Sequence, residues 1–579
     1  MRNIFKGSIV KYFLIVLVLI SCSKQRNSND NALNYALTST VSTLDPALSY
    51  DTVSAKVVYQ AYETLFEYNY LIRPYQLKPL LAKEMPKISD DGLTYTIKLK
   101  ENIYYHESKA FKGKRRMLIA EDFVNQVKRI AFISTKSPGW WLFNSKIKGL
   151  NKFRKEAKSD LSNFFSLDVA GIKALDKFTL KITLNQRYPQ LQNALAMAFT
   201  SPMPAEAITF YENDLSLNMI GTGPYKLVHW NKNSSIKMIR NENYHPAAYP
   251  SNGDRFSYEN NLLKDSTKKI PFIDQINFKI IRESQARWLN FLNKDIDLIT
   301  LTKDHFSSAL NEEGKLSDEF IEKNIALQVA PTLTYWWLSF NMKDPILGKN
   351  LNLRKAFAHA VNIEEYIKKF TNNIALKANS IYPPGVTGYS PGNELPYEYN
   401  ISLAKNFLAK AGYPEGKRLP LFTYDVRGSS TVARQMGEFI QAELAKVGIK
   451  VKVVKNTFPG FLAKSRTGRL QIWQGGWAMD YPDPENVIQL LTTPNHPPGA
   501  NASSYSNPEV DKLYNQLFLA ENEEQVFKIT QRVQQIVSKG LPWVMQFYSR
   551  NYILHKNQLK NFRQSDLIVN NFKYLRLEQ

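Results

Sequence analysis

The chain has 579 residues, of which 44% are hydrophobic and 12% aromatic, a composition typical of a folded globular protein and not of a disordered one. Its formal net charge is +23, but the lysines are spread along the chain and no arginine-rich run alternates with aromatic residues, so we expect no nucleic-acid partner. The length favours two or three lobes, and the positive charge suits a surface that faces an anionic cell envelope.

The amino terminus carries the pattern of an exported, lipid-anchored protein. A basic head at 2–11 precedes an apolar run at 12–20, and the sequence Leu-Ile-Ser-Cys ends at Cys22, the only cysteine. Nine apolar residues, at ~1.5 Å each, cannot span ~30 Å of hydrocarbon, so a transmembrane anchor is disfavoured. We expect residues 1–21 to be a lipoprotein signal peptide, Cys22 to carry the lipid, and residues 22–32 to form a polar tether.

In the first half of the chain, strands alternate with helices. Apolar residues at period two indicate the strands, and apolar residues at helical spacing indicate the helices. The predicted strands are at 32–38, 93–99, 178–184, 221–227, 236–240, 276–281 and 296–301. The predicted helices are at 51–68, 120–130 and 285–292, and the polar, aperiodic stretch at 251–270 indicates a loop insertion.

The same alternation continues in the second half. The predicted strands are at 335–341, 421–426 and 449–454, and the predicted helices are at 353–369, 403–411 and 433–447. Gly412 and Gly448 follow two of these helices, where a glycine commonly ends a helix. The pattern predicts a large α/β protein with mixed sheets.

The usual catalytic and metal-binding motifs are missing from the sequence. The seven histidines form no His-Glu-x-x-His pair and have no cysteine partners beyond the signal region, so we expect no metal site. There is no phosphate-binding Gly-x4-Gly-Lys-Ser/Thr loop and no Gly-x-Ser-x-Gly elbow. The sequence therefore predicts a binding protein without a cofactor, and not an enzyme.

Several segments follow one another along residues 33–550 in a recognisable order. They are Thr43-Leu44-Asp45-Pro46, Pro79-Leu80-Leu81-Ala82, Ala120-Glu121-Asp122-Phe123, Gly221-Thr222-Gly223-Pro224-Tyr225, Leu353-Arg354-Lys355-Ala356-Phe357, Gly412-Tyr413-Pro414 and Trp477-x-x-Asp480-Tyr481-x-Asp483-Pro484. In this order they resemble the bacterial extracellular solute-binding proteins of family 5, the peptide- and nickel-type receptors of ABC importers. The lipoprotein signal fits the same family.

The resemblance implies an α/β fold like that of the type II periplasmic binding proteins, with two main lobes joined by a two-strand hinge and an extra small domain. The expected domains are domain I at 33–75, 196–330 and 542–579, domain II at 76–195, and domain III at 331–541. Ligand would be enclosed between domains I and III. Such closure requires that the ligand contact the closed form better than the open one.

The resemblance also implies a role for Asp480. In peptide-binding members, the aspartate of the Trp-x-x-Asp step holds the free α-amine of the peptide. In an enclosed cleft such a charge-assisted hydrogen bond is worth ~1.5–3 kcal/mol. The alternative is that Asp480 caps a turn beside Pro482 and Pro484.

Arg427 is the second expected ligand contact, because in dipeptide-type members an arginine in this position binds the ligand carboxylate. The two-pronged guanidinium suits that role. The alternative is an ordinary surface arginine beside the loop at 428–430. Three further basic residues could serve the carboxylate of a longer peptide: Lys464, Arg466 and Arg469.

Four residues next to the Trp-x-x-Asp aspartate are expected to offer main-chain or ring contacts: Gly475, Gly476, Trp477 and Ala478. An extended ligand can add to a strand through main-chain hydrogen bonds, and glycines allow its backbone to approach closely. We expect residues 36–40 to supply an opposing strand from domain I.

Two adjacent tryptophans, Trp336 and Trp337, lie on the predicted strand at 335–341. Neighbours on a strand point to opposite faces, so we expect one ring to face the cleft and the other to pack in the core. Arg354, which begins the Arg-Lys-Ala-Phe motif, is expected to be structural.

The sequence thus predicts a monomeric, lipid-anchored receptor that hands short peptides to the permease and ATPase of an ABC importer. A nonpeptide ligand, such as a nickel chelate, haem or an oligosaccharide, is an alternative, because a carboxylate binds any cation. A surface chaperone or adhesin on the same fold is another. Ser23 after the lipidated cysteine leaves open whether the anchor lies at the periplasmic face of the inner membrane or at the outer cell surface.

Overall fold

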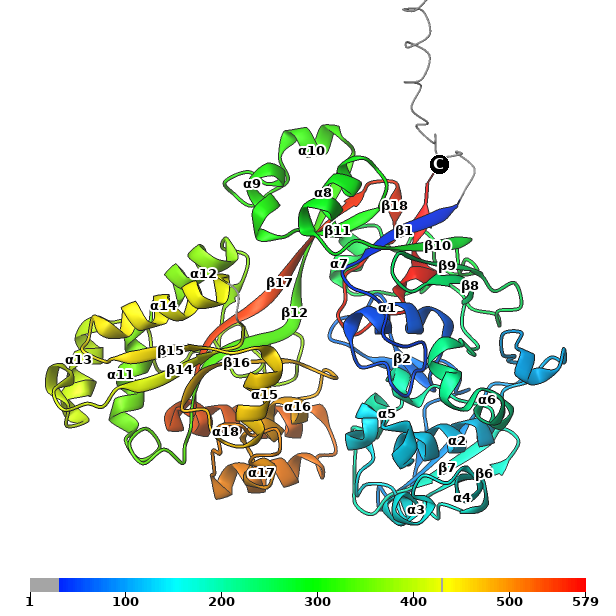
Figure 1. The fold of residues 1–579 in the computed structure, drawn as a ribbon, viewed down its shortest axis with the longest axis horizontal. Coiled ribbons are helices and arrows are strands. Elements are labelled where there is room, and N and C mark those ends of the chain that lie inside the picture. Colours follow the sequence, from blue (N-terminus) through cyan, green and yellow to red (C-terminus); the bar gives the residue numbers. More distant parts are fainter. Residues whose placement is uncertain (1–30, 429–430, 579) are drawn as a thin grey trace, which may run out of the picture.

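The computed structural model of the chain describes residues 31–428 and 431–578. The ribbon divides into two lobes, and the long strands β12 (Ile325–Phe340) and β17 (Trp543–Lys556) run from one lobe into the other (Figure 1). The predicted signal peptide and Cys22, with all but the end of the predicted tether, lie outside the described residues. In the part that is described, no helix is long and apolar enough to cross a lipid bilayer.

The first lobe contains a four-stranded sheet, and the strand nearest the amino terminus lies at one edge of it. The order of strands is β1 (Ala32–Leu37), β10 (Gln275–Ile280), β9 (Ser235–Arg240) and β8 (Tyr225–Asn231). Strand β1 pairs in parallel with β10, with Leu33 opposite Ile276. The remaining elements of this lobe and of the crossing region are α1 (Thr52–Ala61), β2 (Phe66–Tyr68), α6 (Ala205–Tyr211), α7 (Arg255–Glu259), α8 (Ser284–Leu292), α9 (Phe306–Ala309), α10 (Asp318–Glu322), β18 (Leu559–Lys560) and β19 (Arg576–Leu577).

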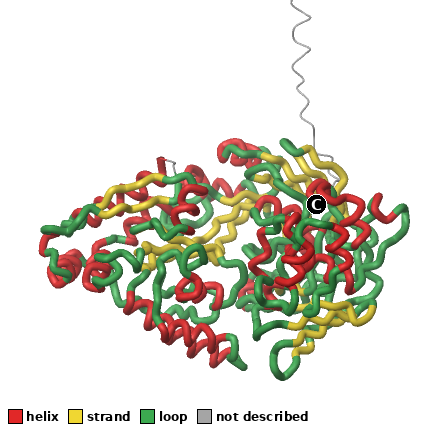
Figure 2. The backbone as a smooth tube through the Cα atoms, turned by 60° about the horizontal axis from the view of Figure 1, so that its bottom comes forward, coloured by secondary structure: helices red, strands yellow, loops and turns green. Residues whose placement is uncertain are grey.

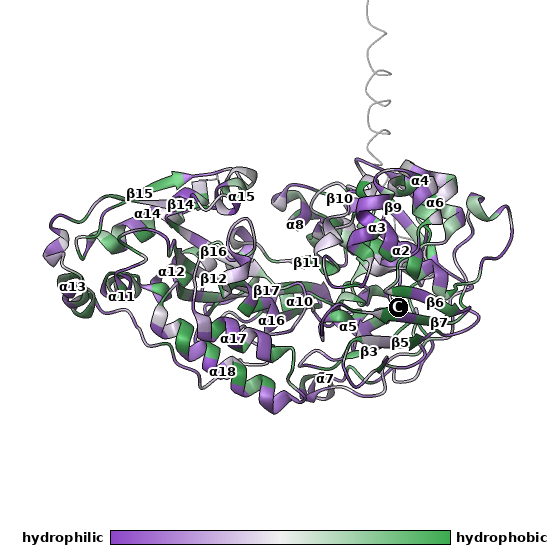
Figure 3. Cartoon of the chain, turned by 90° about the horizontal axis from the view of Figure 1, so that it is seen from below, coloured by the Kyte–Doolittle hydropathy of each residue, from purple (hydrophilic) through white to green (hydrophobic). Residues whose placement is uncertain are grey.

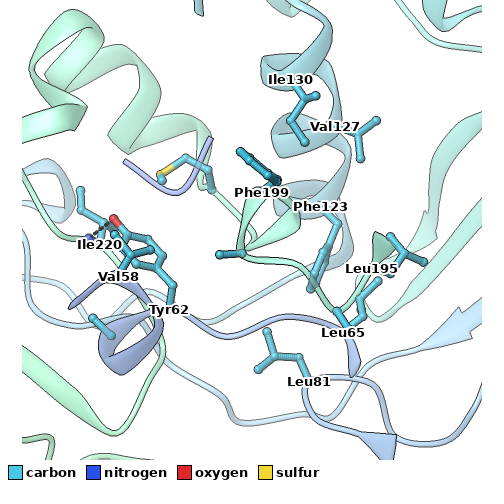
Figure 4. Packing of buried hydrophobic residues seen from close by; sticks show 14 of the residues in the cluster. Val58, Tyr62, Leu65, Leu81, Phe123, Val127, Ile130, Leu195, Phe199 and Ile220 are labelled. Atoms are coloured by element: carbon cyan, nitrogen blue, oxygen red, sulfur yellow. Dashed lines mark hydrogen bonds between the residues drawn. The ribbon is translucent and has the colours of Figure 1, made fainter. Parts of the chain in front are cut away.

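A smaller unit lies below the first lobe in Figure 1. Its elements are β3 (Leu77–Pro79), β4 (Lys87–Ile88), β5 (Thr94–Lys98), α2 (Ala120–Ala131), α3 (Leu150–Ala157), α4 (Leu161–Ser166), β6 (Ile172–Asp176), β7 (Thr179–Thr183) and α5 (Leu191–Ala194). Phe123, Val127 and Ile130 of α2 belong to one buried cluster with Val58 and Leu65 of the first lobe (Figure 4). The small unit and the first lobe therefore share a continuous hydrophobic core.

The second lobe is built on a mixed sheet. Its strand order is β11 (Leu298–Thr300), β17, β12, β16 (Ile472–Ala478), β14 (Phe422–Val426) and β15 (Val451–Lys455), with β13 (Leu376–Lys377) beside β17. The helices of this lobe are α11 (Leu351–Ala360), α12 (Ile363–Thr371), α13 (Ile401–Lys410), α14 (Thr431–Ala445), α15 (Phe458–Arg466), α16 (Glu485–Ile488), α17 (Pro508–Leu517) and α18 (Glu523–Gly540). Loops connect these elements throughout both lobes (Figure 2).

The two crossing strands pair with an interruption. Pro331 pairs with Arg550 and Tyr335 with Tyr548, so residues 332–334 of β12 oppose Ser549 alone. An irregularity of this kind bends a strand pair and increases its twist. Seen from below, β12 and β17 lie at the centre of the molecule, between the lobes (Figure 3).

The predicted helix at 51–68 is shorter in the structure. Helix α1 is followed by Tyr62, which is extended, and residues 66–68 form strand β2 against β3. The intervening Glu63 is buried and accepts hydrogen bonds from His245 Nε2 at 3.0 Å and Thr222 Oγ1 at 2.9 Å. These partners are distant in sequence, so the periodicity of the helix alone could not reveal where it ends.

Two other predicted elements also differ. The predicted helix at 353–369 is divided into α11 and α12, because Asn362 is extended and its side chain accepts a hydrogen bond from Glu365 N, which caps α12. The predicted loop at 251–270 contains α7 and packs against the first lobe through buried side chains of Leu262 and Ile270. The apolar residues that anchor this segment are spaced irregularly among polar ones, so their pattern in the sequence does not indicate a packed element.

Candidate ligand-binding site

A cavity of about 760 Å³ lies between the lobes, a size suited to a small organic ligand. Strand β1 and helix α1 line it from the first lobe, and the residues after β16 line it from the second. The crossing strands complete the wall with Leu333, Thr334, Ser549 and Asn551. The expected opposing segment of domain I contributes Ala36 and Thr38 to the lining.

Asp480 lines this cavity two residues beyond the end of β16. Burial, with a smaller contribution from the charge of Glu485, raises the pKa of Asp480 to about 6, although a hydrogen bond from Asn486 acts in the opposite direction. Among the described residues, Asp480 has no cationic partner. At neutral pH it is therefore an uncompensated carboxylate at the wall of a cavity, an arrangement that favours a positively charged ligand group.

Asn486 on α16 orients this carboxylate and was not anticipated from the sequence. Its Oδ1 accepts hydrogen bonds from Trp477 Nε1 at 2.9 Å and from Asp480 N at 3.2 Å, and its Nδ2 donates to Asp480 Oδ2 at 3.2 Å. The side chain is fully buried. One amide thus joins two of the predicted site residues, and a lone asparagine after a proline-rich turn carries no sequence signal for that role.

Strand β16 has a partly unpaired edge. It pairs with β12 from Ile472 to Ala478, but with β14 only at Ile472 and Trp473. Beyond Trp473, this side of β16 has no strand partner within residues 31–428 and 431–578. The carbonyl of Gly476 points to this side, as its hydrogen bond from Arg427 shows. Arg427 directly follows β14. Main-chain groups alternate along a strand, so those of Ala478 have the same orientation.

Gly475 and Gly476 provide room for the two tryptophans. A Cβ at Gly475 would lie 2.3 Å from the ring of Trp337, and one at Gly476 would lie 2.4 Å from the ring of Trp336. Trp337 is buried and packs on Trp543 at 4.2 Å between ring centroids. Trp336 is half-buried, and its Nε1 donates to Ser549 Oγ at 2.9 Å. Contact of these four residues with a ligand stays a prediction.

Arg427 lies in an aromatic setting. Its guanidinium carbon is 5.2 Å from the ring centroid of Trp336, 5.4 Å from that of Phe458 and 5.6 Å from that of Phe461, and its Nη1 donates to Gly476 O at 2.9 Å. Burial lowers its pKa from the ordinary arginine value. In the described part of the chain it has no carboxylate partner, so an anionic ligand group could supply one.

Two of the three other basic candidates, Lys464 and Arg469, have partners in the protein. Lys464 forms an ion pair with Asp425 at 2.7 Å, and Arg469 Nε donates to Thr467 Oγ1 at 2.9 Å. Arg354 donates to the carbonyls of Gly348 at 2.9 Å and Gly540 at 2.8 Å, which is a structural role. No group of three or more His, Cys, Asp or Glu side chains in the described ranges is arranged to hold a metal ion.

The family model described as bacterial extracellular solute-binding proteins, family 5 Middle, matches residues 76–498, more than half of the chain. The chain belongs to this family. This family 5 solute-binding protein also resembles solved structures over most of its length. DppA from Helicobacter pylori, solved in complex with the peptide STSA, is 28% identical, with a TM-score of 0.70 and coverage of 95% of this chain and 98% of that chain.

Other relatives of this solute-binding protein differ in what their names say they bind. The glutathione-binding protein GsiB of Escherichia coli O6:K15:H31 is 25% identical over 572 residues, covering 97% of this chain and 96% of its own. Heme-binding protein A of Haemophilus influenzae is 24% identical over 550 residues, covering 94% and 92%. HbpA2 from Haemophilus parasuis, at 22% identity and a TM-score of 0.74, shows the same fold.

These findings confirm the predicted family and the predicted fold, an α/β fold of the type II periplasmic-binding-protein kind. Proteins of this family are the solute-binding components of ABC importers, extracellular or periplasmic, and work with a permease. The chain is accordingly a binding protein and not an enzyme.

In this solute-binding protein, the small unit also contacts the second lobe beside the cavity. Gln190 Nε2 donates to Asp483 Oδ1 at 3.3 Å, and the rings of Trp141 and Tyr481 stack with centroids 6.4 Å apart. Burial raises the pKa of Asp483 to about 6, and the charge of Glu485 contributes in the same direction. This contact therefore holds a carboxylate that is costly to bury when ionised.

Proposed function

We propose that this protein captures short peptides in the cavity between its lobes and delivers them to the permease and ATPase of an ABC importer. In this proposal, Cys22 carries the lipid that anchors the protein to the cell envelope, and the protein acts as a monomer. The observation that carries the peptide assignment is Asp480, a carboxylate without a cationic partner that lines the cavity.

The α-amine of a peptide is the natural partner for this carboxylate. Bound there, an ammonium group would replace lost solvation by a charge-assisted hydrogen bond, worth about 1.5–3 kcal/mol net. Asn486 holds the Asp480 carboxylate through Nδ2 at 3.2 Å, so its orientation is set before a ligand arrives. Such pre-organisation reduces the cost of ordering the site on binding.

The unpaired edge of β16 supports the assignment to a peptide in particular. An extended backbone can bond to the main-chain groups that Gly476 and Ala478 direct to this side, as in other cases of strand addition. Arg427 Nη1 donates a hydrogen bond to the Gly476 carbonyl at 2.9 Å. The other N–H groups of the guanidinium can still donate to a ligand carboxylate. We infer that a ligand carboxylate would draw Arg427 from this carbonyl and free it for the peptide backbone.

The comparisons support more than one kind of ligand. The complex of DppA with STSA favours a peptide, and GsiB is named for glutathione, which also carries a free α-amine and carboxylates. Heme-binding protein A is named for a ligand without an α-amine. Dependence of binding on the amine of the ligand separates these possibilities, because Asp480 is the feature that a peptide would use.

The test is calorimetric titration of the purified protein, without its signal peptide, with tri- and tetrapeptides in free and N-acetylated forms. We expect the free forms to bind with dissociation constants near micromolar, about 8 kcal/mol of binding free energy, and acetylation to weaken binding at least about tenfold. Asp480→Asn should remove this preference for the free amine. Asp318→Asn, at an exposed position of α10, should keep it.

Two results would count against the proposal. One is the absence of binding heat and of thermal shift with every peptide. The other is equal binding of free and acetylated peptides by the wild-type protein, which would transfer the assignment to a ligand without an amine. Mass spectrometry of the solute that co-purifies with the native protein would then identify that ligand.

A further inference from the structure

The first lobe places a second charged group in the wall of the cavity. Lys56 and Tyr59 lie three residues apart on α1, so both are on the same face of the helix, and both line the cavity. Asp566, from the carboxyl-terminal segment, lines it as well. None of these residues is among the ligand contacts expected from the sequence, and the amine-binding role of Asp480 on the opposite lobe does not involve them.

Lys56 is surrounded by aromatic rings and not by acids. Its Nζ lies 5.4 Å from the ring centroid of Phe572 and 5.9 Å from that of Tyr35. Within the described parts of the chain, no carboxylate oxygen lies within 4 Å of this Nζ. Burial lowers the pKa of Lys56 to about 8, and the more distant Asp566 opposes that change only in part. The ammonium group is therefore incompletely compensated inside the site.

Asp566 is already engaged by the backbone of a crossing strand. Its Oδ2 accepts a hydrogen bond from Leu333 N at 3.0 Å, and its Oδ1 accepts one from Gln564 Nε2 at 3.4 Å. Burial raises the pKa of Asp566 from the ordinary value. This carboxylate stabilises the irregular segment of β12, so it is a distant counter-charge for Lys56 and not a bonded partner.

Tyr59 adds a second donor next to Lys56. Its hydroxyl oxygen accepts a hydrogen bond from Ala198 N at 2.8 Å. A hydroxyl that accepts one bond can still donate its own proton. The face of α1 toward the cavity thus combines an ammonium group with a phenol, and both groups can donate to an anion.

We infer that Lys56 is a specificity-determining residue that binds a carboxylate of the peptide on the first lobe, opposite the amine site at Asp480. This inference rests on the proposed peptide-binding function and extends it to the chemical class of the peptide: peptides that carry an acidic group besides the one available to Arg427. The carboxylate can come from an acidic side chain or from the carboxyl terminus. The negative charge of Asp566 should weaken the preference of this site for an acidic peptide.

The experiment compares Ala-Glu-Ala with Ala-Gln-Ala, each as the free acid and as the carboxyl-terminal amide, by calorimetric titration. The wild-type protein should prefer one member of a pair about 10- to 100-fold, the size expected of a charge-assisted hydrogen bond. A preference for Glu over Gln that depends on Lys56 assigns Lys56 to the side chain, and a preference for acid over amide that depends on Lys56 assigns it to the terminus. Lys56→Met should abolish that preference, and Lys56→Arg should retain it.

Three further measurements make the result decisive. Lys237→Met, at an exposed position of β9 outside the cavity lining, should behave as the wild type. Asp566→Asn can still accept from Leu333 N and should increase the preference for the acidic peptide, because it removes the counter-charge of Lys56. Thermal unfolding of each variant should show a folded protein before titration.

The possible failures are distinct. If the wild-type protein binds none of the four peptides, the proposed peptide function fails, and the role of Lys56 fails with it. If the wild type binds them but Lys56→Met weakens all four equally or changes none, the inference about Lys56 is wrong and the peptide function stands. An Asp566→Asn variant that weakens binding of the acidic peptides would also overturn it.

Discussion

At the scale of single residues, the carboxylate that the cavity offers to a ligand reduces the stability of the ligand-free protein. Burial raises the pKa of Asp480 to about 6, so folding favours the protonated form of this side chain over the ionised form. The stabilising effect of protonation is complete below about pH 4 and is lost as the pH rises through about 6. At neutral pH the difference amounts to at most about 3 kcal/mol, since the side chain still reaches solvent.

Replacing this carboxylate should therefore stabilise the ligand-free protein while it weakens ligand binding. Asp480→Asn should unfold about 1–3 °C higher than the wild type at pH 7.5, and the difference should vanish near pH 4, where both folded proteins are neutral at this position. Differential scanning calorimetry at the two pH values measures this. Asp483, whose pKa is also raised to about 6 by burial, titrates in both proteins and cancels in the difference. Lower stability of the variant at both pH values would indicate a structural role for Asp480.

The residues of the site differ in how far the sequence reveals them. Asp480 was identified through its motif, and the structure places it at the cavity. Asn486 and Lys56 were not anticipated: one is a buried asparagine with partners six and nine residues away, and the other is a lysine on the side of α1 that lines the cavity. Their roles depend on which neighbours the fold brings together, and neither residue has a local pattern of its own.

At the scale of secondary-structure elements, β12 and β16 fit together through complementary volumes. The rings of Trp336 and Trp337 lie over Gly476 and Gly475, which are their cross-strand partners in the register. Side chains directly opposite each other on paired strands contribute to the stability of a sheet. Here the large residue of each pair needs the absence of a side chain on the other strand, and Arg427 fills the space beside Gly476.

A methyl group at position 476 should disturb both the sheet and the arginine. In Gly476→Ala, the new Cβ would lie 2.4 Å from the Trp336 ring and 2.6 Å from Arg427 Nη1, so one or both must move. We expect a loss of about 1–3 kcal/mol in the free energy of unfolding, measured by urea denaturation with tryptophan fluorescence. Gly392→Ala is the matched control, because its Cβ would be exposed with only Ser390 Oγ, 4.0 Å away, nearby. Equal stability of the two variants would contradict this account of the glycines.

Most elements could be placed from periodicity, because strands and helices of this protein have clear apolar faces. The predicted helices at 120–130, 403–411 and 433–447 correspond to α2, α13 and α14 within a few residues. The division of the predicted helix at 353–369 was missed, because the side chain of Asn362 caps α12 at the centre of a continuous apolar pattern. Long-range pairing, such as that of β12 with β17, cannot be deduced from local patterns.

At the scale of the whole molecule, the ligand cavity depends on how the two lobes meet. The small unit shares its core with the first lobe, so a movement of that lobe carries Gln190 and Trp141 with it. These residues contact Asp483 and Tyr481 of the second lobe beside the cavity. Closure of the lobes and formation of this contact are therefore linked, and any change that weakens the contact should favour the open form.

Gln190→Glu tests this linkage, because it places a second carboxylate against Asp483 in a region where Glu485 already adds negative charge. Like charges at this distance repel, so we expect the open form to gain population, the radius of gyration from small-angle X-ray scattering to increase, and the affinity for every peptide to fall about five- to tenfold. Gln190→Met is the matched neutral control of similar length and should have a smaller effect. If the two variants show the same affinity and radius of gyration, the contact does not control closure, and closure would depend on the ligand and the crossing strands alone.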